Sequence, residues 1–217
     1  MTGLIWKDIL VMRKTLRTYA LFLLFYAALA VMGLFSLSMV TAMVEVIMMM
    51  LPIGAFSYDE QAKWDKYAFA MPLSRRQIVS ARYGFTLIMA LGSAAFGLLA
   101  CVVLSFIDPT QLLVENLASV LVALGIGLFI ADVLLPLCYK LGPERARPYL
   151  YLVVFLPTLL LFGAGKLGLL DSLDLSWIDS LSSVGVLGLF ALVPLAALAG
   201  LAVSWLYSCR ILKQKEF

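Results

Sequence analysis

Five tracts that are nearly free of charge constrain the fold of this chain more than any other feature. They are residues 19–56, 83–107, 117–138, 149–165 and 181–209. A helix needs about 20 mostly apolar residues to cross a hydrocarbon core of roughly 30 Å, so each tract is long enough to span a membrane. Charged residues make up 13% of the chain, against about 25% in soluble domains. The sequence therefore predicts an integral membrane protein.

The first tract is too long for one span. At 1.5 Å per residue a single helix over 19–56 would reach about 57 Å, so we expect the chain to fold back at the segment GLFSLS, Gly33 to Ser38. This predicts an all-α membrane protein with six transmembrane helices, built as a single membrane domain over residues 1–217 because no repeat or linker divides it. The expected spans are about 19–34, 39–56, 83–106, 117–138, 149–165 and 183–207.

The basic residues predict the orientation of the spans. With six spans, every Lys and Arg except Lys166 falls on the side of the membrane that carries both termini. Cytoplasmic loops are enriched in Lys and Arg, so both termini are expected in the cytoplasm. The opposite loops are acidic; their carboxylates are Asp108, Glu115, Asp171, Asp174 and Asp179. The net charge of +3 is thus explained by topology and contact with anionic lipid rather than by nucleic acid.

Residues 1–18 resemble a helix that lies flat in the inner leaflet. Apolar side chains recur there every three or four residues, and basic side chains occupy the other side. The apolar stripe consists of Ile5, Ile9, Met12 and Leu16, and the basic residues are Lys7, Lys14 and Arg17. This N-terminal amphipathic interfacial helix is expected to brace the first span.

Missing residue types exclude several kinds of active site. The chain has no histidine, which removes the central residue of zinc metalloproteases, Ser–His proteases and haem-binding bundles. It has no G-x-x-x-x-G-K-[ST] loop, so any ATP must be bound by another subunit. Its three cysteines lack C-x-x-C spacing, which indicates neither a disulfide framework nor a metal site. We therefore expect no enzyme activity and no cofactor in this chain.

Two carboxylates, Glu45 and Asp132, lie inside apolar tracts. Such residues are expensive in a membrane and are by default candidates for function, here as the lining of a translocation path or of a subunit seam. The alternative is that each lies near an interface and is satisfied by water or a neighbouring hydroxyl. Their expected positions, each roughly 9 Å from opposite surfaces, argue against a shared acid pair. An intramembrane enzyme is accordingly disfavoured.

The polar stretch SYDEQAKWDKYAFAMPLSRRQI, residues 57–78, predicts two helices separated by a proline. Trp64, Tyr67, Ala68 and Met71 share one helical face, and Pro72 ends that helix. Ser74 and Gln77 form a capping-box pattern, so a new helix is expected to begin at about Arg75 and to run into the third span.

The aromatic face of this stretch favours contact with a partner protein over simple lipid anchoring. Exposed Trp and Tyr suit both roles. However, the acids Asp59, Glu60 and Asp65 would be repelled by anionic lipid and attracted by a basic groove on a protein.

Residues 56–83 resemble the signature of a bacterial subfamily of ABC type-2 transporter permeases. That signature has an acidic pair after the second span, an aromatic residue, a Pro-x-Ser-Arg turn, and a basic residue before a tyrosine. The matching residues are Asp59, Glu60, Trp64, Pro72, Ser74, Arg75, Arg82 and Tyr83. The N-terminal LIWKDIL and the six expected spans extend the resemblance over nearly the whole chain.

The resemblance implies a permease that pairs with a second permease copy, as a homodimer, and with two ATPase subunits that bind ATP and Mg. It implies that residues 58–77 contain the coupling helix that docks in the ATPase. The expected contact residues are Asp59, Glu60, Trp64, Asp65, Lys66, Tyr67, Met71, Pro72, Arg75 and Arg76. It further implies the bacterial cytoplasmic membrane and export of amphipathic peptides, such as phenol-soluble modulins or bacteriocin-like peptides.

Two alternatives stay open at this point. One is a membrane peptide-immunity or sensor protein that binds peptides without pumping them, which would act without an ATPase. The other is a permease that exports a lipid or a drug-like molecule. Co-purification of an ATP-binding subunit would separate the first alternative from a transporter.

Overall fold

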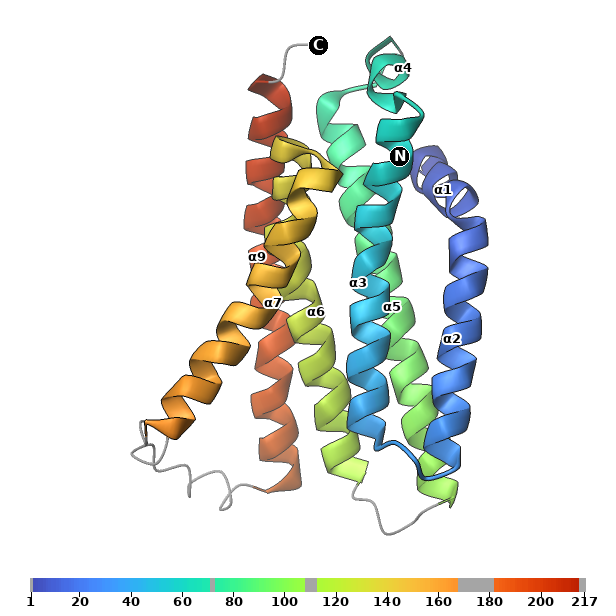
Figure 1. Cartoon of the computed structure of the whole chain (residues 1–217), viewed down its shortest axis with the longest axis vertical. Coiled ribbons are helices and arrows are strands. Elements are labelled where there is room, and N and C mark those ends of the chain that lie inside the picture. Colours follow the sequence, from blue (N-terminus) through green and yellow to red (C-terminus); the bar gives the residue numbers. More distant parts are fainter. Residues whose placement is uncertain (1, 71–72, 108–112, 168–181, 215–217) are drawn as a thin grey trace.

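The computed structural model describes residues 2–70, 73–107, 113–167 and 182–214, and over these residues every regular element is a helix. Figure 1 shows the helices running side by side as a bundle. Their bounds are α1 Thr2–Val11, α2 Arg13–Val31, α3 Leu37–Gln61, α4 Trp64–Ala70, α5 Arg75–Ile107, α6 Leu113–Leu141, α7 Pro143–Lys166 and α9 Ser183–Gln214.

Within the described ranges, six helices are long and apolar enough to cross a membrane: α2, α3, α5, α6, α7 and α9. This confirms the predicted all-α fold with six spans. Each helix overlaps one expected span, and most continue by a turn or more into the flanking charged residues, as α9 does when it ends at Gln214 rather than near residue 207. The apolar tract marks only the part of a helix that lies in the hydrocarbon core, and the helix itself continues to its capping residues.

The fold-back between the first two spans occurs where the sequence predicted it. α2 ends at Val31 and α3 begins at Leu37. Gly33 adopts a positive φ of 73°, which glycine tolerates because it has no Cβ. The amides of Gly33 and Leu34 donate to the carbonyls of Ala30 and Leu29, and these bonds close the last turn of α2.

The N-terminal segment differs from the single interfacial helix that its periodicity predicts. It divides at Met12 into α1 and the start of α2, and the two helices meet at an angle (Figure 1). The side chain of Met12 is 1% exposed and packs in a cluster with Leu51, Ala55 and Phe85. The apolar stripe of this segment therefore contacts the protein itself. The periodicity could not distinguish a lipid surface from a protein surface, because both are apolar.

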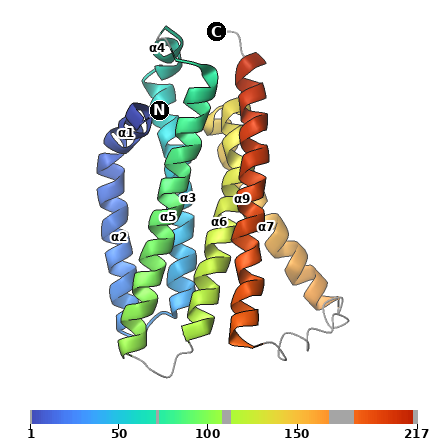
Figure 2. The same ribbon diagram turned by 180° about the vertical axis from the view of Figure 1, so that it is seen from behind.

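Among the described helices, α6 and α9 pack against each other most extensively. A Cβ on Gly125 of α6 would lie 2.6 Å from Val193 Cγ1 and 2.9 Å from the Pro194 backbone nitrogen of α9. Only a residue without a side chain fits there, and small residues are what allow membrane helices to approach closely. α7 packs beside α6 near one end and then diverges from the bundle (Figures 1 and 2).

A chain of hydroxyl groups joins α5, α6 and α9. The Ser204 hydroxyl donates to the backbone carbonyl of Asp132 at 2.6 Å, so it must accept the bond from the Tyr83 hydroxyl at 2.7 Å. The Tyr83 oxygen in turn accepts from Ser208 at 2.8 Å. Tyr83, the last residue of the motif recognised in the sequence, thus fixes one helix against two others.

Candidate functional site

The candidate site lies at one end of the bundle, which we call the α4 end. α4, α1, the beginning of α5 and the last turns of α9 all lie there (Figure 1). Charged side chains from α1, α3 and α5 converge at this end, where the spans leave their apolar tracts.

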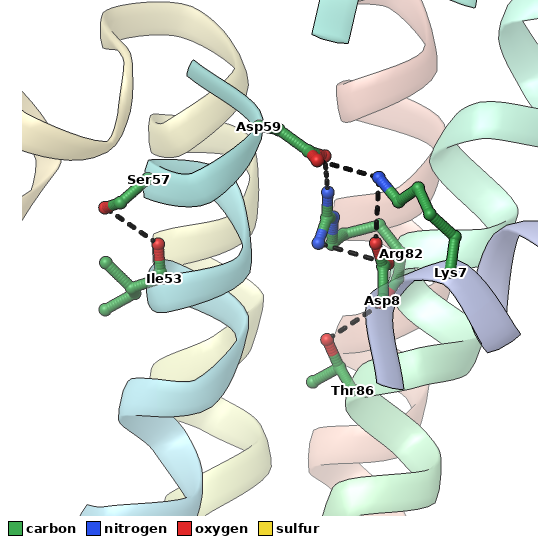
Figure 3. A network of polar contacts seen from close by, with 7 residues as sticks. All are labelled: Lys7, Asp8, Ile53, Ser57, Asp59, Arg82 and Thr86. Atoms are coloured by element: carbon green, nitrogen blue, oxygen red, sulfur yellow. Dashed lines mark hydrogen bonds and ion pairs between the residues drawn. The ribbon is translucent and has the colours of Figure 1, made fainter. Parts of the chain in front are cut away.

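A cluster of four charges connects three helices just below α4 (Figure 3). Arg82 of α5 forms ion pairs with Asp8 of α1, at 3.1 Å, and with Asp59 of α3. Lys7 of α1 lies 2.7 Å from the Asp59 carboxylate and 3.0 Å from that of Asp8. Two cations therefore face two anions, and the cluster is neutral as a whole. We call these four residues the charge cluster.

Burial makes Arg82 the centre of the charge cluster. It is 5% exposed, and its guanidinium lies 4.5 Å from the ring centroid of Phe56. A guanidinium in such surroundings needs anionic partners, because removing one partner leaves an uncompensated buried charge. The two carboxylates supply these partners and hold α1 and α3 against α5.

Sequence reasoning included Asp59 and Arg82 in the motif but missed Asp8. The position of Asp8 in the sequence does indicate a buried carboxylate. Asp8 lies between Ile5 and Met12 at helical spacing, on the same stripe that packs against the protein, and it is 4% exposed. A carboxylate on a buried stripe requires a cationic partner from another element.

α4 presents one face to the rest of the chain and another to its surroundings. Lys63, at a positive φ of 50°, turns the chain between α3 and α4. The Lys7 ammonium lies 4.3 Å from the centroid of the half-buried Trp64 ring, and Ala68 is buried. Tyr67 points outward and is 62% exposed. The predicted apolar face is therefore divided between internal packing, by Trp64 and Ala68, and free surface, by Tyr67.

The charged residues of segment 58–77 divide in the same way. Asp59 is bound within the charge cluster, and the Arg75 guanidinium donates to the backbone carbonyls of Leu212 and Lys213, at 3.0 and 2.6 Å. Exposed side chains remain at Glu60, Lys66 and Arg76. Asp65 lies within α4. Met71 and Pro72 lie outside the described residues.

The predicted start of α5 is confirmed in detail. The Ser74 backbone amide donates to Gln77 Oε1 at 3.0 Å, and the Gln77 amide donates to Ser74 Oγ at 3.2 Å. This reciprocal pair is a capping box, and α5 begins at the next residue, Arg75.

A cavity of about 120 Å³ lies between α4 and the charge cluster. Its walls include Lys7, Asp59, Trp64, Arg82 and Tyr139. A polar space of this size can hold several water molecules.

The two intramembrane carboxylates lie in separate surroundings. Glu45 of α3 is buried and accepts a hydrogen bond from Ser93 of α5 at 2.6 Å, while its Oε2 has no partner among the described residues. Asp132 of α6 lies against Gly200 of α9, and its buried Oδ1 has no hydrogen-bond partner in the part of the chain that the structure describes.

The family model described as ABC-2 family transporter protein matches residues 3–213. The chain belongs to the ABC-2 transporter family. It is thus the membrane-spanning permease subunit of an ABC transporter, a component that is not itself catalytic, and its family implies an ABC ATPase as partner. No curated protein and no solved structure matched the chain in the same comparisons.

Proposed function

We propose that this ABC-2 permease exports amphipathic peptides from the bacterial cytoplasm, driven by two ATPase subunits that dock at the α4 end. The observation that carries the proposal is that Glu60, Lys66, Tyr67 and Arg76 all have exposed side chains at the α4 end, where the buried charge cluster lies. We call these four residues the docking surface. An exposed tyrosine in a segment that also exposes charges of both signs suits the anchor of a protein contact.

The charge cluster connects the docking surface to the membrane-spanning helices. α4 packs on Lys7 through Trp64, and Lys7 and Asp8 bind Asp59 of α3 and Arg82 of α5. A displacement of α4 by an ATPase would therefore be transmitted to α1, α3 and α5 together. In this proposal Asp59, Trp64 and Arg75 hold the docking surface in position, and Tyr67 enters the ATPase.

The cytoplasmic position of the α4 end is supported by the distribution of charge. The positive-inside rule assigns the α4 end to the cytoplasm, where an ATPase has access to ATP and Mg. Peptide export follows from the sequence resemblance to exporters of amphipathic peptides. A second copy of the permease would complete the path, since an exporter of this kind works as a pair.

Transport into inverted vesicles tests this function. Vesicles that contain the permease and its ATPase should accumulate a labelled amphipathic peptide when ATP and Mg are supplied, and should not do so with a non-hydrolysable ATP analogue. ATP-dependent uptake of a lipid or a drug-like probe, with no uptake of peptide, would replace the proposed substrate. Peptide binding without any uptake would favour the immunity or sensor alternative.

A surface substitution tests the docking site separately. Tyr67→Ala should release the ATPase from the purified complex while the permease keeps its thermal stability, because Tyr67 makes little contact within the chain. Tyr151→Ala, at a similarly exposed tyrosine on α7, is the matched control and should retain the ATPase. Retention of the ATPase by the Tyr67 variant would contradict the docking site.

A further inference from the structure

A groove between α6, α7 and α9 has a volume of about 1160 Å³. It forms because α7 diverges from the bundle after leaving α6 (Figure 2). Its walls are almost wholly apolar and include Phe129, Val154, Ala196 and Val203. Ligand sites are typically grooves of this size and kind, with few polar groups.

One charged residue, Asp132, interrupts this apolar lining, and no Lys or Arg is among the lining residues. Its Oδ1 is buried and finds no hydrogen-bond partner within the described ranges. Three hydroxyl groups also line the groove: Ser204 donates to the Asp132 backbone carbonyl, Thr158 donates to the carbonyl of Val154, and the third belongs to the exposed Tyr207. A carboxylate in an apolar site is costly unless a cation or a donor reaches it.

Asp132 also lies at a defined depth. It is roughly 14 Å from the α4 end of α6, at 1.5 Å per residue, and so within the span rather than at its end. The Gly200 position opposite has no side chain, and a Cβ there would lie 2.4 Å from Asp132 Oδ2. The absence of a side chain at Gly200 leaves the space that the carboxylate occupies.

We propose that the groove between α6, α7 and α9 binds a cationic amphiphile, with the apolar part of the ligand on the groove walls and its amine on Asp132. Charge complementarity decides this occupant, because a lipid tail or a second copy of an apolar helix would leave the carboxylate without a partner. The role of the groove as a substrate site rests on the proposed export function. Binding itself requires neither ATP nor the ATPase.

The test is therefore a binding measurement on the purified permease in nanodiscs without the ATPase. The probes are a fluorescent long-chain alkylamine and its neutral N-acetyl analogue. The amine should bind roughly tenfold more tightly, because a charge-assisted hydrogen bond to a carboxylate is among the stronger polar contacts. Equal affinities in the unmodified protein would overturn the proposal and identify the groove as a lipid-filled surface.

Three variants locate the site. Asp132→Asn should abolish the preference for the amine while both probes still bind. Ala196→Trp should fill the groove and weaken both probes, whereas Leu198→Trp, on the same helix but outside the groove, should weaken neither. Persistence of the amine preference in Asp132→Asn, or equal effects of the two tryptophans, would refute the site. If Asp132→Asn does not fold, the comparison of the two probes and the tryptophan pair still decide it.

A photo-crosslinker at the position of Phe129 shows whether a ligand or a second copy of the permease covers the groove. Phe129 lines the groove and is exposed, so a benzoylphenylalanine there should label the alkylamine. Crosslinks that join two permease chains instead would show that a second copy covers the groove and would overturn ligand binding there. Failure of peptide export with amine binding intact would contradict the proposed function and leave the groove site standing.

Discussion

Arg82 of α5 lies 3.1 Å from the carboxylate of Asp8, across 74 residues of sequence, and both side chains are buried. This pair attaches the N-terminal helix to the centre of the bundle. Asp8→Asn should therefore destabilise the permease by about 3 kcal/mol, because the buried guanidinium loses one of its two carboxylates.

Thermal unfolding, followed by size-exclusion chromatography of heated samples, measures this effect. Lys14→Gln, at an exposed position on the neighbouring α2, is the control and should leave the melting temperature unchanged. A melting temperature of Asp8→Asn equal to that of the control would show that the pair adds nothing to stability.

Gly125 should be intolerant of even one methyl group. An alanine Cβ would lie 2.6 Å from Val193 Cγ1 and 2.9 Å from the Pro194 nitrogen, so α6 and α9 would have to separate. Gly92→Ala is a matched control, since no atom lies within 4 Å of a Cβ there, and it should be neutral or stabilising by up to about 1 kcal/mol. If the two alanines have the same effect on thermal stability, the close α6–α9 contact is not required.

Ser93 should matter because it provides the hydrogen bond to Glu45. Ser93→Ala would leave both oxygens of a buried carboxyl group without a partner, at a cost of about 1–3 kcal/mol. Thr18→Val removes an exposed hydroxyl that bonds only to its own helix and should cost little. Equal melting temperatures for these two variants would indicate that Glu45 is satisfied in some other way.

Glu45→Gln addresses function rather than stability. Glutamine keeps an oxygen that can accept from Ser93, so the fold should persist. If Glu45 lines the path or the subunit seam, export or dimerisation should fall in this variant. Unchanged export and assembly would reduce Glu45 to a structural residue.

Much of the fold follows from local signals in the sequence. Gly33 supplies the positive φ at the fold-back, and the Ser74–Gln77 capping box fixes the start of α5. Such signals act within a few residues, so they can be recognised without knowing which segments pack nearby in the folded protein. The apolar tracts are equally local, because the hydrocarbon core acts on each span separately.

The arrangement of the candidate site depends on contacts that the sequence does not reveal. Nothing near Asp59 indicates that its partners are Lys7 and Arg82, at separations of 52 and 23 residues. Nor does the amphipathic stripe of α4 reveal that Trp64 faces inward while Tyr67 faces outward. The sequence alone therefore predicts all these side chains of segment 58–77 as partner contacts, although some of them make contacts within the chain.

The central claim is that the α4 end couples this permease to an ATPase through the docking surface. The most direct measurement is the amount of ATP-binding subunit that co-purifies with tagged permease, compared between the unmodified protein and the variant Tyr67→Ala, Arg76→Glu. The account predicts stoichiometric ATPase with the unmodified protein and its loss from the folded variant. Equal recovery from both proteins would contradict it.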